Sequence, residues 1–465
     1  MPHTRFIPGF LVTSVLVLLA GAHPIVAQQN RVDAPALLDA RMYALVDAVR
    51  ADRIMDDVRT LAGFGTRNTF SDTLSSTRGI GAARRWIEAE FRRISASCGL
   101  CLEVSTQRMF VEEGSSSRAI RDVEVVNVLA IQRGTRYPDS YVIMAGDIDS
   151  RASDATDGTT DAPGANDNAS GMAGVIEAAR VLSGHEFPSS IVYVGLSGEE
   201  QGLWGGAHMA GVAREEGWNI VGVVNNDMIG NIEGIDGVID NRSFRIFSEP
   251  TPVTETEQER RRRRFEGGEV DGVSLQLARY VHRMTQLYMP EMNPVLVYRL
   301  DRFGRGGHHR PFNDAGYPGI RIMETHENYT RQHQDIRVED GIAYGDVVEG
   351  VNADYAARLT AVNILTLAGL AAAPPAPDQV RIGGAVQPST TLQWDPVDDP
   401  NLAGYLIYWR DTTAPQWQHM RFVGPDVTSH TLKGIVIDNF LFGVASVGTD
   451  GNQSVVTFPS GRLRR

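Results

Sequence analysis

Three short apolar segments near the middle of the chain are each followed closely by acidic residues. The segments are residues 141–145, 191–194 and 220–224. Short apolar segments that alternate with helices are typical of buried strands in a largely parallel sheet. The carboxyl ends of parallel strands meet at one edge of the sheet, where open α/β folds bind ligands. We therefore predict an α/β fold whose central, mostly parallel mixed sheet gathers carboxylates at one edge.

Segments with helical periodicity lie before and between these strands. Apolar residues recur about every 3.6 positions in residues 31–62, 77–95 and 169–182. An apolar face on each expected helix needs a partner surface. We expect helices of this kind to cover both faces of the sheet.

The acidic residues at the predicted sheet edge form a set that calls for cations. Like charges this close repel one another unless they are neutralised. Carboxylates suit divalent ions such as zinc, manganese, magnesium or calcium, and a bridging carboxylate can hold two metals about 3.5–4 Å apart. The alternative, that the acids only cap helices and line solvated loops, explains one acid better than the whole set. The set is Asp147, Asp149, Asp167, Glu199, Glu200 and Asp227.

The adjacent pair Glu199 and Glu200 indicates a division of labour. One carboxylate can bind a metal while the other takes a proton from a metal-activated water. Asp167 lies in a loop, residues 163–171, that leads into a predicted helix. The pattern predicts metal-dependent hydrolysis.

The motifs around these acids resemble metallopeptidase family twenty-eight. That family includes two-zinc aminopeptidases, glutamate carboxypeptidases and the peptidase-like domain of transferrin receptors. The resemblance covers about residues 40–370, and it includes the predicted helix at residues 79–91. The matching motifs are residues 146–150, 164–171, 197–205 and 226–230.

The resemblance implies a zinc-aminopeptidase-like fold and a site for two divalent metal ions, zinc in the first place. Asp167 would bridge the ions, Asp227 would bind one of them and Glu200 the other. Glu199 would be the general base. Asp149 would orient the neighbouring ligand or the attacking water.

Two positions depart from the pattern of that family. Asp147 stands where the family carries a histidine ligand, so we expect Asp147 to bind metal and to allow manganese or magnesium as well as zinc. The last ligand in the family is a histidine four residues before an aspartate. Counting back from Asp335 leads to Arg331, so we predict the nearby His333 as the ligand, with His326 as a weaker substitute.

Two further histidines, His308 and His309, lie where the family often has a histidine that contacts a ligand residue or the substrate. The alternative is that both are ordinary loop residues.

The function predicted from these motifs is a metallopeptidase, most simply an aminopeptidase, acting on peptide or protein substrates. One alternative is a degenerate relative that binds partners without turnover, which the changes at Asp147 and Arg331 would favour. Another is a related carboxypeptidase or glutaminyl cyclase. Glu199 and Glu200 favour the enzyme.

The N-terminus predicts export. Arg5 precedes an apolar run at residues 10–22, and residues 1–27 have the pattern of a cleaved signal peptide. The run is short for a membrane span, so a retained anchor is the less favoured alternative. We expect a periplasmic or extracellular protein without a stable membrane span. The formal net charge of −13 also argues against nucleic acid as a partner.

The two cysteines, Cys98 and Cys101, are separated by two residues. Such a pair can be a redox centre, half of a zinc site or a local disulfide. There is no second pair of this kind, and exported proteins retain disulfides, so we favour a structural bridge.

The composition changes near residue 371. We predict a metallopeptidase domain at residues 31–370, a Pro/Ala linker at 371–378 and an all-β sandwich at 379–465. The last segment resembles a fibronectin type III module, with Trp394 in its core, and is expected to dock on another protein or surface. The arginine run at residues 260–264 predicts a solvated insertion.

Overall fold

The computed structural model describes residues 34–463. The predicted signal peptide, residues 1–27, lies outside the described residues.

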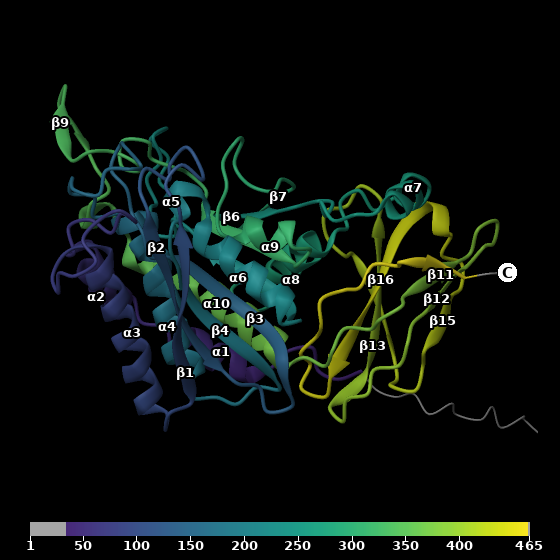
Figure 1. Cartoon of the computed structure of the whole chain (residues 1–465). Helices are drawn as coiled ribbons and strands as arrows, with labels where there is room; N and C mark the ends of the chain where they lie inside the picture. Colours follow the sequence, from purple (N-terminus) through teal and green to yellow (C-terminus); the bar gives the residue numbers. More distant parts are fainter. Residues whose placement is uncertain (1–33, 464–465) are drawn as a thin grey trace, which may run out of the picture. The chain divides into compact units, whose positions relative to one another are not determined.

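Eight strands form the central sheet in the order β1-β2-β4-β3-β5-β8-β6-β7. Figure 1 labels β1, β2, β3, β4, β6 and β7 of this sheet. The pairs β4/β3, β3/β5, β5/β8 and β6/β7 are parallel, while β1/β2, β2/β4 and β6/β8 are antiparallel. The predicted mixed, mostly parallel sheet is confirmed. Its strands are β1 (Leu102–Val111), β2 (Val123–Gln132), β3 (Tyr137–Asp147), β4 (Ser189–Leu196), β5 (Asn219–Asn226), β6 (Ser243–Ser248), β7 (Asn293–Val297) and β8 (Gly319–Glu324).

Helices cover both faces of this sheet. Buried residues of α3, α4, α8 and α10 form one large hydrophobic cluster with one face of the strands. Residues of α6 and α9 form a second cluster with the opposite face. The helices are α1 (Ala40–Asp47), α2 (Ala51–Ala62), α3 (Gly79–Ser97), α4 (Gly171–Leu182), α5 (Glu199–Gly202), α6 (Trp204–Glu215), α7 (Glu257–Glu266), α8 (Val273–Tyr288), α9 (His309–Asp314) and α10 (Ala353–Ala372).

The shorter elements complete the chain. The segment Ala165–Ser170, η1, precedes α4, and 3-10 turns form at Val348–Gly350 and Ile437–Asn439. A two-stranded hairpin pairs β9 (Arg337–Glu339) with β10 (Ile342–Tyr344).

Helix α10 is the one described helix that is long and apolar enough to cross a membrane. Its most apolar window is 89% buried inside the protein, which is the behaviour of a core helix.

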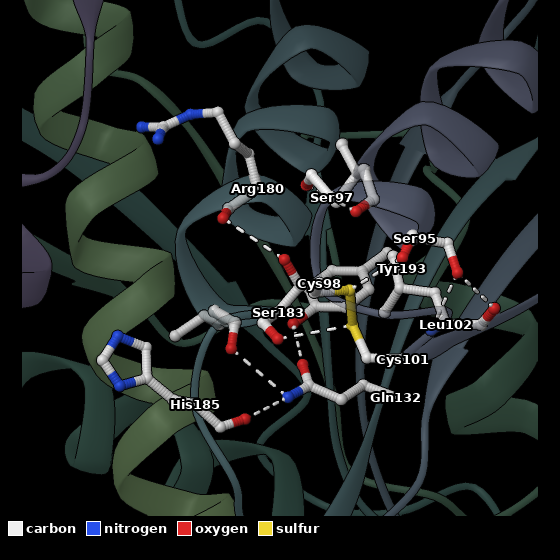
Figure 2. The surroundings of a disulfide bond; sticks show 12 residues. Ser95, Ser97, Cys98, Cys101, Leu102, Gln132, Arg180, Ser183, His185 and Tyr193 are labelled. Atoms are coloured by element: carbon white, nitrogen blue, oxygen red, sulfur yellow. Dashed lines mark hydrogen bonds between the residues drawn. A yellow bond between two sulfur atoms is a disulfide. The ribbon is translucent and has the colours of Figure 1, made fainter.

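Cys98 and Cys101 form a disulfide with a Cα–Cα distance of 5.6 Å. Figure 2 shows the bridge between the end of α3 and the start of β1, beside Ser95 and Ser183. The Oγ of Ser95 donates to the carbonyl of Leu102 at 2.9 Å and accepts from its N–H at 3.1 Å. The expected local bridge is confirmed, and it closes the turn that leads into the edge strand of the sheet.

The chain beyond α10 forms two small sheets. One has the strand order β15-β12-β11-β17 and the other β14-β13-β16. Trp394 is 2% exposed in the cluster between them, as predicted. Helix α10 ends two residues inside the segment predicted as a linker. The strands are β11 (Arg381–Gly383), β12 (Thr390–Gln393), β13 (Leu402–Asp411), β14 (His419–Val423), β15 (Ser429–Leu432), β16 (Phe440–Gly448) and β17 (Gly461–Arg462).

A buried ion pair connects β13 with the segment before α8. Arg410 donates to both carboxylate oxygens of Asp271, at 2.8 and 2.7 Å, and neither side chain is exposed. Arg279 on α8 contacts the same carboxylate at 3.0 Å.

The arginine run belongs to helix α7, which has no buried residues. Thr256 and Glu259 form a capping box at its start, and Glu257 pairs with Arg260 and Arg261 along its surface. The segment is therefore solvated, as expected, and local hydrogen bonds keep it helical.

Candidate metal centre

The predicted acidic edge forms at the carboxyl ends of β4, β3 and β5, which are neighbours in the sheet. Strand β3 ends at Asp147, and Asp227 follows the last residue of β5. After β4, Gly198 has φ +74°, a left-handed conformation that favours glycine. This turn starts α5, so Glu199 and Glu200 stand at the same edge.

Asp167, Glu200 and His333 converge on one point. The Nε2 atom of His333 lies 2.9 Å from Oδ2 of Asp167 and 3.3 Å from Oε1 of Glu200. One ligand atom from each residue lies within 4.8 Å of the others, and among the described residues this is the group found with such spacing. An imidazole and two carboxylates are a donor set that fits zinc and leaves a coordination position open.

The charges of these three residues depend on one another. Burial raises the pKa of Asp167, but the hydrogen bond with His333 and its charge outweigh this and hold the pKa below its usual range. Burial lowers the pKa of His333, but Glu200 and Asp167 together outweigh this effect and raise the pKa to about 10. In the metal-free protein a protonated His333 thus holds the two carboxylates together.

The loop that carries Asp167 is held by other buried residues. Asp346 accepts the backbone N–H groups of Asn166, at 2.8 Å, and of Asp167, at 2.7 Å. Arg67, which is 1% exposed, donates to the carbonyls of Ile148 and Gly164, both at 2.9 Å. These contacts tie the loop to the end of β3 and preorganise the Asp167 carboxylate.

Asp149 orients the acidic pair after β4. Its two carboxylate oxygens accept the backbone N–H groups of Glu199 and Glu200, each at 3.1 Å. Burial, followed by the charge of Glu200, raises the pKa of Glu199 well above the usual value. A carboxylate with a raised proton affinity is suited to act as a general base.

Asp147 is enclosed by donors from the protein. Its Oδ1 lies 2.5 Å from Nδ1 of His308, and its Oδ2 accepts from Nδ2 of Asn168 at 2.6 Å. Burial, followed by the charges of Asp227 and Asp149, raises the pKa of Asp147. Burial also lowers the pKa of His308 to about 4. His308 thus contacts Asp147, one of the acids predicted to bind metal.

Asp227 is paired with an arginine. The Nη2 atom of Arg321 lies 2.8 Å from Oδ2 of Asp227, and Arg321 has no exposed side-chain surface. On its other side, Nη1 of Arg321 contacts Asp301 at 3.1 Å. Burial raises the pKa of Asp227 to about 6 against the opposing charge of Arg321.

The similarity of this chain to known proteins covers much more of the sequence than the motifs around the acidic residues. The profile of "Peptidase family M28" matches residues 127–344. A protein of Pyrenophora teres f. teres named "probable zinc metalloprotease" is 39% identical, over 90% of this chain and 87% of its own length. A protein of Leptosphaeria maculans with a name of the same kind is 40% identical, over 90% of this chain and 97% of its own length. The chain belongs to peptidase family M28.

Solved structures share the M28 fold with this chain. The Legionella pneumophila LapA aminopeptidase superposes with a TM-score of 0.50 at 17% identity, over 73% of this chain and 77% of its own. An aminopeptidase from Aneurinibacillus has a TM-score of 0.50 at 13% identity, over 72% of this chain and 97% of its own.

The other histidines considered in this M28 chain lie away from the convergent group. The Nε2 atom of His309 is 2.7 Å from the carbonyl of Leu300, and His326 pairs with Asp236 at 3.1 Å. Arg331 pairs with Glu233 at 2.6 Å. Of the residues considered for the last ligand, the structure brings only His333 to Asp167 and Glu200 within the described residues.

Sequence reasoning missed Arg321, which the M28 match includes. Strand β8 is otherwise apolar from Ile320 to Met323, and every residue in it is buried. A single arginine inside a buried apolar strand is a signal that it has a buried partner. The sequence therefore shows that Arg321 needs a buried partner, but it does not show that this partner is Asp227.

Proposed function

We propose that this protein is an exported, zinc-dependent peptidase, and specifically an aminopeptidase. The observation that carries the proposal is the convergence of His333, Asp167 and Glu200, with Glu199 next to Glu200 in the chain and its backbone N–H held by Asp149. Its membership of peptidase family M28 and the names of the relatives support the same conclusion.

Asp167, Glu200 and His333 would hold the zinc ion. When bound, zinc supplies a Lewis acid that polarises a peptide carbonyl and makes a nearby water more acidic. The carboxylates of Asp167 and Glu200 would also neutralise the positive charge of the zinc ion.

Glu199 is the residue that moves the proton. Its carboxylate takes a proton from the attacking water and returns it to the nitrogen of the leaving amine. Asp149 fixes the backbone of Glu199 and Glu200 by accepting hydrogen bonds from both of their N–H groups. The charges of Glu200 and Asp167 both act on the Glu199 carboxyl, which supports its place at the same acidic edge as the ligand group.

Aminopeptidase specificity is supported by the names of the two solved structures that share the fold. Export is supported by the pattern of residues 1–27 and by the disulfide between Cys98 and Cys101, since disulfides persist in oxidising compartments. We further propose that residues 379–465 are a fibronectin type III-like module that docks on another protein or surface.

The proposal is tested with zinc-loaded protein and a panel of aminoacyl p-nitroanilides, each compared with its N-acetylated form. We expect hydrolysis of the free-amine substrates only. The Glu199→Gln variant should lose at least about 100-fold in kcat and keep its zinc. Glu215→Gln, an exposed position on α6, is the matched control and should retain activity. Equal cleavage of the acetylated substrates would exclude an aminopeptidase, and full activity of Glu199→Gln would exclude Glu199 as the base.

A further inference from the structure

We propose that the site holds one divalent ion, at Asp167, Glu200 and His333, and that the guanidinium of Arg321 takes the place of a second ion beside Asp227. The inference rests on the proposed metal site and changes the number of ions that the family resemblance implies. Asp227 then serves as the partner of an arginine instead of a metal ligand.

The position of Arg321 follows from the sheet. Strand β8 runs parallel to β5, and Arg321 pairs in register with Asn225, close to the strand end that Asp227 follows. Ile320 and Ile322 belong to the large hydrophobic cluster, so Arg321 between them projects from the opposite face of the strand. The backbone of the central sheet thus places the positively charged side chain of Arg321 at the acidic edge.

Several contacts hold the guanidinium in this position. Its Nη1 donates to the carbonyl of Gly306 at 2.9 Å and contacts Asp301 at 3.1 Å, while its Nη2 lies 2.8 Å from Asp227. None of the Arg321 side chain is exposed, and the Asp301 side chain is 1% exposed. Arginine is not deprotonated in proteins, so the positive charge next to Asp227 is permanent.

Asp147, the other acid that a second ion beside Asp227 would need, is engaged by the protein, whereas Oδ1 of Asp227 is buried without a hydrogen-bond partner among the described residues. Both carboxylate oxygens of Asp147 are in hydrogen-bond contact with protein donors, one with His308 and the other with Asn168. In the described residues, neither Asp147 nor Asp227 joins a group of three donor side chains with metal-site spacing. A divalent ion placed between Asp167 and Asp227 would face the guanidinium and would be repelled by it.

The charge of the site also agrees with this assignment. A second cation in this family would neutralise the carboxylates at the ends of β3 and β5. Here Arg321 already lies between Asp227 and Asp301, and its charge acts on Glu199 and Asp167 as well. A buried arginine paired on both sides performs the neutralising role without an open coordination position.

The number of bound zinc ions tests the inference directly. Full-length protein is loaded with zinc, exchanged into metal-free buffer and measured by native mass spectrometry and elemental analysis. We expect one ion per chain in the wild type, one in Asp227→Asn and none in His333→Gln. Two ions in the wild type, falling to one in both variants, would overturn the inference.

Arg321→Met tests the role of the arginine itself. Loss of the charge frees Asp227, so this variant should bind a second, weaker zinc ion, while Arg245→Met on β6 should still bind one. A single ion in Arg321→Met at saturating zinc would overturn the role given to Arg321. Because the single variant leaves Asp227 buried without its partner, Arg321→Met/Asp227→Asn is compared by thermal melting to separate misfolding from metal binding.

The outcomes also separate this inference from the proposed function. A wild type with two zinc ions and peptidase activity overturns the role of Arg321 and leaves the peptidase intact. A wild type that binds no zinc and has no activity overturns both.

Discussion

The Nε2 atom of His333 lies 2.9 Å from Oδ2 of Asp167, although the two residues come from separate loops. Asp167 lies in η1 before α4, whereas His333 lies between β8 and β9. The contact brings an imidazole to an acidic edge whose other members lie at strand ends, in η1 and in α5.

Replacement of His333 by glutamine should weaken zinc binding at least about 100-fold, because it removes the only imidazole of the ligand group. Zinc affinity is measured by competition with a chromophoric chelator. His326→Gln is the matched control, since His326 pairs with Asp236 on a different surface. Equal affinity in the two variants would contradict the ligand assignment.

Proton binding at His333 should make both stability and zinc affinity depend on pH. Burial lowers its pKa, but Glu200 and Asp167 raise it to about 10, above the unperturbed value of 6.5. Protonated His333 therefore stabilises the metal-free fold fully below about pH 6.5, and this contribution is lost as the pH rises toward about 10. Zinc displaces the same proton, so its affinity should rise over this range.

The pH prediction is checked by urea unfolding of the metal-free protein. The difference in unfolding free energy between wild type and His333→Gln should shrink as the pH rises from about 6.5 to 10. A difference that stays constant over this range would show that His333 does not carry the proton.

Asp149→Asn should lower kcat by about 10- to 100-fold and leave zinc stoichiometry unchanged. The amide cannot accept both N–H groups of Glu199 and Glu200, so the base loses its orientation. Steady-state kinetics with zinc analysis distinguishes this effect from metal loss. Asp154→Asn, an exposed position nearby in the chain, should behave as wild type.

Removal of the disulfide by Cys98→Ser/Cys101→Ser should lower the unfolding free energy by about 2 kcal/mol, the value expected for a very short closed loop. Chemical denaturation measures the change. A reductant should destabilise the wild type by a similar amount and leave the variant unaffected. Zinc binding should persist, because neither cysteine contacts the ligand group. Destabilisation of the variant by the reductant would contradict this account.

Arg410→Met should destabilise the protein by about 3 kcal/mol, because it removes one partner from the buried carboxylate of Asp271. Thermal and urea unfolding report the loss. Arg421→Met, at an exposed position on β14 of the same module, should change stability little. An equal loss of unfolding free energy in Arg410→Met and Arg421→Met would show that the buried ion pair with Asp271 stabilises the protein no more than an exposed arginine does.

Much of the fold follows from local patterns that can be read along the chain. The apolar segments became β3, β4 and β5, and they lie side by side in the order β4-β3-β5. Because side-chain periodicity is a local property, it identifies strands and helices without knowledge of their neighbours. The carboxylates at the strand ends were therefore placed at one sheet edge before any contact was known.

The same argument could not specify the polar contacts within that edge. Counting along the chain led to Arg331, whereas the fold directs Arg331 to Glu233 and brings His333 to Asp167. Loop conformation decides which of several nearby side chains points inward, and spacing in the sequence does not contain it.

The α/β class, the acidic edge and the adjacent pair Glu199 and Glu200 could be predicted from the sequence, because they depend on periodicity and on residues close in the chain. The contacts of Arg321 with Asp227 at 2.8 Å and of His308 with Asp147 at 2.5 Å are visible only in the folded chain. Each pair joins segments that are distant in sequence, and their approach depends on how strands and loops pack. The number of cations at the site is therefore a property of the fold.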